Sequence, residues 1–454
     1  MAKSKTVFVC QSCGAQSPKW MGKCTSCGAW NSFQEEVIQS SVSTASTPIT
    51  TSGHKPTILS EIKTEKLNRI ATGIHELDQV VGGGIVPGSV ILLGGEPGIG
   101  KSTLLLQVAV SLDKKVLYVS GEESPQQIYL RAQRLNVPSN TCYIYSETNV
   151  AAIIQEIKTF QPELVIIDSV QTLKHPDIDA SPGSVSQIRE TTNLLIELAK
   201  QTHIPMLLIG HINKEGSIAG PKILEHMVDV VLQFEGDMQN VYRILRSNKN
   251  RFGSTAEIGI FEMVQNGLRE VSNPSEIMLS GNPEKLSGVA IASVMEGIRP
   301  LMIEVQALVS TAAYGTPQRT VNGFDGKRLN MLLAIIEKRL GVKIYTKDVF
   351  LNIAGGIRVQ DPAIDLAVVA AILSSLFDFY IPSSYCFAGE VGLTGEIRSV
   401  SQVEKRIKES TKLGIQKMFV PPCDIQSKSQ CNVIPCTRVD QTFREIFKKQ
   451  SATE

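Results

Sequence analysis

The chain has 454 residues, and its 45 lysine and arginine residues nearly balance its 44 aspartate and glutamate residues, for a formal net charge of +1. One hydrophobic core does not organise so long a chain, so about three domains are expected. The balanced charge excludes a global attraction to nucleic acid or membrane, and any such binding must be local. The sequence contains no run of about 18 apolar residues and no signal peptide, so we expect a cytoplasmic protein without a membrane partner.

Residues 1–35 are predicted to form a small cysteine-rich head. Cys10, Cys13, Cys24 and Cys27 make two C-x2-C pairs separated by ten residues. Each pair presents two thiolates from one tight turn, and two such turns complete a tetrahedral Zn²⁺ site. Four protein ligands leave no open position, so the predicted zinc is structural. The alternative, two disulfides, requires an oxidising compartment, which the odd total of nine cysteines argues against.

Basic and aromatic residues surround these cysteines. The two tryptophans of the chain, Trp20 and Trp30, flank the second pair, and four lysines precede the first acidic residue, Glu35: Lys3, Lys5, Lys19 and Lys23. Such a surface suits nucleic acid or a protein partner. Alternatively, the tryptophans pack the core of the head. Residues 36–60, rich in serine and threonine, are predicted to form a flexible linker.

Residues 61–270 alternate short apolar runs with helical patterns. The runs are "SVILLGG", "KVLYVSG", "ELVIIDSV" and "IPMLLIGH", and this alternation predicts a mostly parallel sheet covered by helices on both faces, an α/β domain. After residue 270 the pattern restarts. Residues 275–454 mix strands such as "PLMIEVQALVS" with helices such as "AIDLAVVAAILSSLF", which indicates a further domain of α+β type.

The stretch "GEPGIGKS", residues 95–102, matches the phosphate-loop pattern G-x-x-x-x-G-K-[ST], and it follows a predicted strand and opens a helix, as the motif requires. Its glycines let the loop wrap closely, so that N–H groups and the helix N-terminus meet phosphate oxygens. Lys101 then faces the β and γ phosphates, and Ser102 offers a hydroxyl to Mg²⁺. The predicted ATP-binding residues are Gly95, Glu96, Pro97, Gly98, Ile99, Gly100, Lys101, Ser102 and Thr103.

Further polar residues follow the predicted strands. Asp168 ends an apolar strand, where its carboxylate can hold the hydration shell of Mg²⁺. Glu122 and Glu123 follow another strand, where one of them can polarise the attacking water, although a glutamate pair also suits the start of a helix. Glu122 is the first choice for the catalytic role. His211, at the tip of a further strand, is a candidate sensor of the γ-phosphate.

Lys249 and Arg251 lie in "SNKNRFGST", residues 247–255, between two apolar runs. The pattern predicts the turn of a hairpin. Taken alone, two cations in a turn are most simply solvated residues.

Several motifs resemble the RadA (Sms) family of bacterial and plastid recombination proteins: "TGIHELDQVVGGGIVPGSVILLGGEPGIGKST", "SGEES", "IIDSVQT", "GHINKEG" and "KNRFG", behind a four-cysteine head. The resemblance covers essentially the whole chain, and the middle is similar to the RecA core. It implies an α/β RecA-like P-loop ATPase core, preceded by a zinc ribbon and followed by a domain similar to that of Lon protease. It also implies a DNA-dependent ATPase that forms homo-hexamers, binds single-stranded and branched DNA, works with the RecA recombinase and drives branch migration.

The same resemblance implies a role for the two cations. In RecA-like rings ATP lies between subunits, and Lys249 and Arg251 would reach the neighbouring subunit's γ-phosphate. Alternatively, the turn faces the ring channel and contacts DNA phosphates.

The C-terminal part resembles the proteolytic domain of Lon in "GGIRVQDPAIDLAVVAAILSS" and "GEVGLTGEIRSVSQVEK". With Asp361 aligned to the aspartate of that family, Ile364 stands where the nucleophilic serine is expected, and Glu404 stands where its lysine is expected. A serine needs an adjacent amine as its base, so peptidase activity is predicted to be absent. Ser374 and Ser375 lie about three turns further along the predicted helix, too far to substitute.

The predicted arm at residues 314–331 carries Arg319, Lys327 and Arg328. These side chains either follow a DNA backbone or belong to a solvated loop. For the whole chain, two other functions remain open: an ATP-dependent protease, and a non-motor ATP-binding regulator resembling KaiC.

Overall fold

The structure is a computed structural model that describes residues 4–10, 14–39, 68–137, 140–210, 223–236, 242–271, 273, 275, 279, 286–312, 316–356, 358–423 and 431–448. The chain forms two compact units. The first comprises residues 1–238 and 243–270, and the second comprises residues 239–242 and 271–454.

The N-terminal head is a three-stranded antiparallel sheet of order β2-β1-β3, formed by β1 (Ser4–Cys10), β2 (Gln16–Ser17) and β3 (Phe33–Gln39). Cys10, the last residue of β1, pairs with Phe33, the first residue of β3. Cys10, Cys24 and Phe33 are buried together. So small a sheet has little other core, and the cysteines occupy its centre. Residues 40–67, which include most of the predicted linker, lie outside the described residues.

The first unit is built on a nine-stranded sheet of order β12-β11-β10-β9-β4-β8-β7-β5-β6. Six strands run parallel: β4 (Val90–Gly95), β5 (Val116–Ser120), β6 (Cys142–Ser146), β7 (Leu164–Asp168), β8 (Met206–Ile209) and β9 (Val230–Glu235). Beyond them lie β10 (Tyr242–Asn250), β11 (Ile258–Val264) and β12 (Gly267–Glu270), with antiparallel pairing of β10 to β9 and of β11 to β12.

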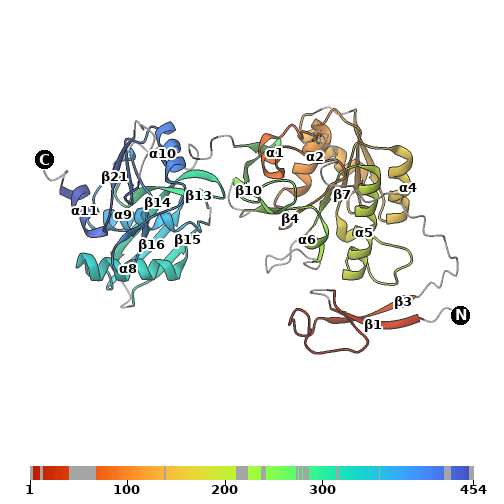
Figure 1. Ribbon diagram of the computed structural model, residues 1–454, viewed down its shortest axis with the longest axis horizontal. Helices are drawn as coiled ribbons and strands as arrows, with labels where there is room; N and C mark the ends of the chain where they lie inside the picture. Colours follow the sequence, from red (N-terminus) through yellow and green to blue (C-terminus); the bar gives the residue numbers. More distant parts are fainter. Residues whose placement is uncertain are drawn as a thin grey trace, which may run out of the picture. The chain divides into compact units, whose positions relative to one another are not determined.

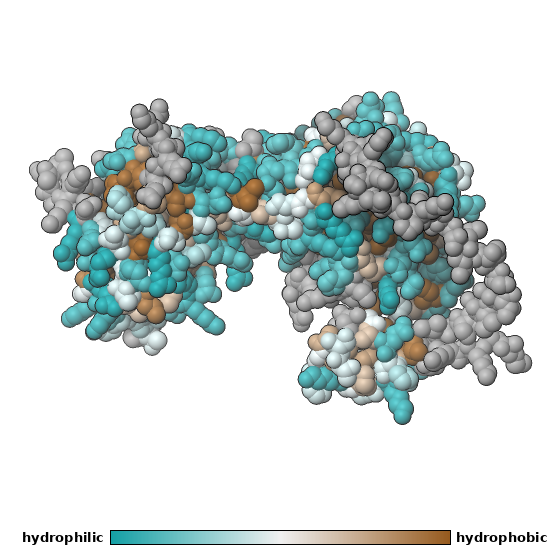
Figure 2. Space-filling model, in the orientation of Figure 1, coloured by the Kyte–Doolittle hydropathy of each residue, from teal (hydrophilic) through white to brown (hydrophobic). Residues whose placement is uncertain are grey.

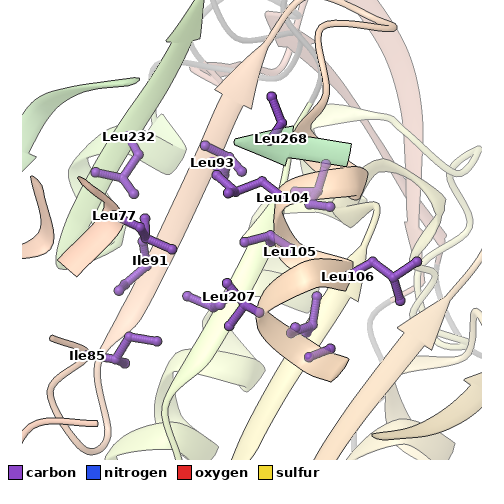
Figure 3. Close-up of a cluster of buried hydrophobic side chains, with 14 of the residues drawn as sticks. Leu77, Ile85, Ile91, Leu93, Leu104, Leu105, Leu106, Leu207, Leu232 and Leu268 are labelled. Atoms are coloured by element: carbon purple, nitrogen blue, oxygen red, sulfur yellow. The ribbon is translucent and has the colours of Figure 1, made fainter. Parts of the chain in front are cut away.

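Helices cover both faces of this sheet because successive strand residues point to opposite sides (Figure 1). Ile91 and Leu93 of β4 pack with α1 (His75–Val81), α2 (Lys101–Ser111) and α3 (Pro125–Arg134). Figure 3 shows Leu104 and Leu105 of α2 beside the strand residues Leu93 and Leu207. Val90 and Leu92 pack on the other face, with α4 (Val150–Phe160), α5 (Val185–Thr202) and α6 (Ile223–Met227).

The second unit contains a seven-stranded mixed sheet of order β15-β16-β14-β13-β17-β20-β21. Its strands are β13 (Val289–Glu296), β14 (Arg299–Thr311), β15 (Arg319–Asn322), β16 (Lys347–Ile353), β17 (Tyr385–Phe387), β20 (Lys417–Val420) and β21 (Asn432–Pro435). A small ladder joins β18 (Glu390–Val391) to β19 (Ile397–Arg398).

The helices of this unit are α8 (Gly326–Leu340), α9 (Asp365–Leu376), α10 (Val403–Lys412) and α11 (Val439–Lys448). Every residue of α9 from Asp365 to Ser374 is buried. A helix that is apolar on all sides belongs inside a domain, so α9 is the central helix of this core.

On the face shown in Figure 2, apolar residues form small patches among hydrophilic ones. Within the described ranges, no helix combines the length and the apolar character that crossing a bilayer requires.

Candidate nucleotide and metal sites

The phosphate loop lies between β4 and α2. Gly95 ends β4, and Gly100 caps α2 with a φ of 119°, a left-handed value that favours glycine. A Cβ on Gly100 would first meet the terminal methyl of Met263, at 2.9 Å, which can move aside, so the positive φ is what reserves this position for glycine. Glu96, Pro97 and Gly98 are exposed at the tip of the loop. The loop before α2 is therefore accessible to solvent, and its backbone N–H groups and the N-terminus of α2 can bind an anion.

The Lys101 side chain is buried and folds back over this loop. Its Nζ donates to the carbonyl oxygens of Gly95 at 2.7 Å and Glu96 at 2.9 Å. Burial lowers the pKa of the Lys101 ammonium to about 8, against the opposing influence of the Asp168 and Glu122 carboxylates. Ser102 and Thr103 follow on the first turn of α2 and are half-buried. A cation held mainly by carbonyl dipoles gains a stronger partner when an anion enters the loop.

Asp168 is the last residue of β7, which neighbours β5 and β8 in the sheet. Its Oδ2 accepts a hydrogen bond of 2.6 Å from the Tyr118 hydroxyl of β5. Burial, and then the Asp168 charge, raise the pKa of the Tyr118 phenol well above its usual range. Tyr118 therefore donates to Asp168 as a neutral group.

The two adjacent glutamates have different surroundings. Glu122 is exposed and its Oε1 accepts from the Ser169 hydroxyl at 2.7 Å. Glu123 forms a two-pronged ion pair with Arg131 of α3, with N to O distances of 2.7 and 3.1 Å. Neither starts a helix, since α3 begins at Pro125 behind a capping box made by Ser124 and Gln127. Arg131 faces both carboxylate oxygens of Glu123, whereas the Glu122 carboxylate is open to solvent, so the geometry favours Glu122 as base.

Lys249 lies in a strand, so the prediction that it belongs to a hairpin turn is wrong. β10 continues to Asn250, with a bulge between Ser247 and Lys249, because β9 supplies partners along its whole length. The Lys249 Nζ donates to three carbonyl oxygens at 2.8 to 2.9 Å, those of Glu225, His226 and Val228. Burial, and then Arg251, lower the pKa of Lys249. Lys249 thus satisfies carbonyls at the end of α6.

Arg251 follows β10 and begins the turn. Its Nη1 pairs with Asp229 Oδ1 at 3.1 Å, and its side chain is 51% exposed. The turn is fastened to the core, because Asn250 Nδ2 donates to Val81 O at 3.2 Å and Arg69 Nη2 donates to Phe252 O at 2.9 Å. Arg251 is therefore presented to solvent from a fixed backbone.

Three of these residues carry no motif in the sequence, namely Tyr118, Arg131 and Asp229. Tyr118 is the one polar-tipped side chain in the apolar run "VLYV", and that is the only signal that could have found it. The positions of Arg131 and Asp229 depend on tertiary packing. His211 lies outside the described residues, and so does Cys13.

Three of the four predicted zinc ligands converge in the head. The sulfur atoms of Cys10, Cys24 and Cys27 all lie within 4.8 Å of one another, and those of Cys10 and Cys27 are 3.7 Å apart. Four sulfurs around zinc at about 2.3 Å would be separated by about 3.8 Å, whereas a disulfide bond is about 2.05 Å long. These spacings point to metal ligation rather than to disulfides.

The backbone repeats the same turn at both cysteine pairs. The amides of Cys10 and Gly14 bond Ala15 O and Cys10 O, and the amides of Cys24 and Gly28 bond Ala29 O and Cys24 O. Gly14 and Gly28 both have positive φ, 72° and 77°. The residues that flank the first pair, Cys10, Gly14 and Ala15, thus make the same hydrogen bonds as Cys24, Gly28 and Ala29.

Trp20 and Trp30 are 54% and 71% exposed, so the alternative that they pack the core of the head is wrong. The Lys23 ammonium lies 5.4 Å from the centre of the Trp30 ring. Lys19 and Lys23 are exposed as well. The head presents aromatic and basic side chains together on its surface.

In the second unit, the positions aligned with the serine and the lysine of the Lon dyad are occupied by Ile364 and Glu404. Ile364 is buried, Glu404 is exposed, and Asp361 pairs with the fully buried Arg406 at 2.6 Å. The hydroxyls of Ser374 and Ser375 accept from the amides of Gly288 and Val309 at 2.8 and 2.9 Å. Both serine hydroxyls are therefore occupied by hydrogen bonds to the backbone of the same unit.

The predicted DNA-following arm is only partly available. Arg328 forms an ion pair with the buried Asp365, and its Nη2 also donates to Val391 O at 3.1 Å. Arg328 therefore belongs neither to a solvated loop nor to an open surface, because the N-terminal turn of α8 directs it toward α9. Arg319 and Lys327 are exposed.

Three family models match the chain: the AAA domain over residues 56–217, the rubredoxin metal binding domain over residues 8–35, and subunit ChlI of Mg-chelatase over residues 306–424. Together with the two sheets and the cysteine cluster, they confirm the predicted fold class. It is a RecA-like core behind a zinc ribbon, with a ChlI/Lon-like C-terminal domain.

Relatives match over nearly the full length. The chain is 48% identical to the DNA repair protein RadA of Bacillus subtilis, over 94% of each chain, and 49% identical to that of Listeria monocytogenes, over 93% of each. Among solved structures, the crystal structure of the RadB recombinase is 21% identical, with a TM-score of 0.37, and the match covers 44% of this chain and 99% of that one.

Proposed function

Because the chain belongs to the RadA family of DNA repair proteins, we propose that its AAA domain is the motor of a DNA-dependent ATPase that drives branch migration of recombination intermediates. One observation carries the proposal. The phosphate loop, Asp168 and Glu122 all follow the carboxyl ends of parallel strands of one sheet, which is where open α/β sheets bind their ligands.

The residues at this edge suit ATP with Mg²⁺. The loop from Gly95 to Thr103 offers backbone N–H groups and the Lys101 ammonium to the phosphates. The Ser102 hydroxyl and the Asp168 carboxylate are oxygen donors of the type that Mg²⁺ prefers, and they would hold the ion with its waters. When bound, Mg²⁺ neutralises charge on the β and γ phosphates.

Glu122 acts as the general base on the attacking water. Its carboxylate is exposed and held through Ser169, so it can reach a water at the phosphate end of the site. Glu123 is bound to Arg131 and contributes to the shape of the site instead.

Arg251 supplies charge to the ATP of the adjacent subunit in a homo-hexamer. Its exposure and its fixed turn support this role, whereas the three carbonyl partners of Lys249 support a role in holding that turn. The alternative is contact with DNA phosphates. Arg251→Ala with unchanged DNA affinity and lost turnover supports the first role. A weaker affinity with a shallower salt dependence supports the second.

Single-stranded and branched DNA are the proposed substrates, and the RecA recombinase is a proposed partner. The exposed tryptophans and lysines of the zinc head, with Arg319 and Lys327 of the second unit, are candidate contacts. A four-cysteine zinc site that includes Cys13 would fix the head.

The test measures ATP hydrolysis with and without single-stranded DNA, and branch migration of a four-way junction labelled with fluorophores. We expect DNA to stimulate hydrolysis by the intact chain, and Lys101→Ala to reduce hydrolysis by about 10²-fold or more while the chain stays folded. Equal hydrolysis with and without DNA would instead favour a non-motor regulator. Hydrolysis that survives in Lys101→Ala would refute the site.

A further inference from the structure

Tyr118 is buried completely in the middle of β5, among valine and leucine side chains. Its backbone pairs with Ile166 of β7, and its hydroxyl reaches along β7 to Asp168, two residues further. Packing alone would be served by phenylalanine. The hydroxyl is explained by its bond of 2.6 Å to Asp168 Oδ2, the carboxylate at the nucleotide site.

A second donor lies close to the same oxygen. Arg131 Nη2 lies 4.0 Å from Asp168 Oδ2, at the outer limit of an ion pair and beyond hydrogen-bond distance, whereas its ion pair with Glu123 Oε2 is 2.7 Å long. The two donors differ in their effect. A neutral phenol leaves the negative charge of the carboxylate in place, whereas a guanidinium pair would neutralise it.

We propose that Tyr118 is a positioning residue that holds Asp168 Oδ2 and keeps the carboxylate from forming a close, hydrogen-bonded pair with Arg131, so that its charge remains for the divalent cation that accompanies ATP. This inference rests on the proposed function, since it takes Asp168 as the carboxylate of a metal–nucleotide site. Arg131 stays with Glu123 only while Asp168 has its own neutral donor.

The experiment uses Mn²⁺ as the probe, titrated into the full-length chain with saturating ATP and followed by electron paramagnetic resonance. Tyr118→Phe keeps the ring and removes only the hydroxyl. We expect the half-saturating Mn²⁺ concentration to rise about tenfold, as for loss of a hydrogen bond to a charged group. Adding Arg131→Gln to Tyr118→Phe removes the competing cation, and we expect it to return the value toward that of the intact chain.

Two controls separate positioning from packing. Tyr145→Phe alters a half-buried tyrosine on the adjacent strand β6 and should leave Mn²⁺ binding unchanged. ATP affinity in EDTA should be the same in Tyr118→Phe and in the intact chain. An unchanged Mn²⁺ titration in Tyr118→Phe overturns the inference, as does a parallel loss of metal-free ATP affinity. A Tyr118→Phe/Arg131→Gln chain no better than Tyr118→Phe overturns the competition with Arg131.

The two proposals fail differently. If the intact chain binds Mn²⁺ with ATP but DNA has no effect on hydrolysis, the motor function fails, and the role of Tyr118 is still decided by the titration. If the intact chain binds no Mn²⁺ with ATP, both proposals are wrong.

Discussion

Lys101 in the first unit and Arg406 in the second are both buried cations, and they differ in their partners. Arg406 is bound to Asp361 at 2.6 Å and also donates to the carbonyls of Ser401 and Ser293. Lys101 donates to two loop carbonyls, and burial lowers its pKa to about 8. A cation with a carboxylate and carbonyls around it is complete within the fold. A cation whose hydrogen bonds go to carbonyl oxygens has capacity left for an anionic ligand.

The same contrast extends to neighbouring groups. In the second unit, Asp365 is matched by Arg328 and the Ser374 hydroxyl bonds a backbone amide. In the first unit, Glu122 is exposed, and its Oε1 accepts from the Ser169 hydroxyl at 2.7 Å. The candidate reactive site thus combines an exposed carboxylate with a buried cation that donates to carbonyls, whereas the second unit pairs its buried charges with each other.

The largest effect is expected at the catalytic edge of the first unit. Glu122→Gln should lower ATP turnover on the order of 10²- to 10⁴-fold, because the amide cannot accept the proton of the attacking water. Nucleotide binding and the free energy of unfolding should change little. The matched variant Glu123→Gln should lose far less turnover. Steady-state hydrolysis and equilibrium nucleotide binding decide the comparison, and a larger loss in Glu123→Gln would reverse our assignment of the base.

The next effect concerns stability in the second unit. Arg406→Met leaves the Asp361 carboxylate, whose side chain is only 10% exposed, without its guanidinium partner, and we expect a loss of about 3 to 5 kcal/mol in the free energy of unfolding of this unit. Urea unfolding of the full-length chain measures it. Lys405→Met, the adjacent exposed position, should stay within about 0.5 kcal/mol. Equal stability of the two variants would mean that the Arg406 pair is not structural.

The smallest effect is a pH dependence of nucleotide binding. Lys101 is protonated below its pKa of about 8 and loses its charge above it. Affinity for ATP should therefore be constant below about pH 8 and fall by up to about tenfold per pH unit above it, until the pKa in the complex is reached. Lys101→Arg keeps its charge and should show no such fall. A flat profile for the intact chain between pH 7 and 9.5 would contradict the depressed pKa.

The sequence predicted the parts of this site that depend on local order. The phosphate loop is contiguous, Asp168 ends an apolar strand and Glu122 lies two residues beyond another, so the meeting of strand ends in a parallel sheet brings them together. The sequence could not predict the pairing of Glu123 with Arg131 or of Arg251 with Asp229, since these ion pairs depend on how helices and distant strands pack. The bulge that puts Lys249 inside β10 depends on the register with β9, which a single strand does not encode.

The carboxylate of Asp229 links the turn that carries Arg251 to the strand that precedes the phosphate loop. Its Oδ1 holds Arg251, and its Oδ2 accepts from the amide of Val90, the first residue of β4. The far end of β4 is Gly95, where the phosphate loop begins. A displacement of the Arg251 guanidinium is thus transmitted through the Asp229 side chain to the first residue of β4, because a tightly packed interior transmits strain. The turn that carries Arg251 and the phosphate loop are thus connected through Asp229 and the single strand β4.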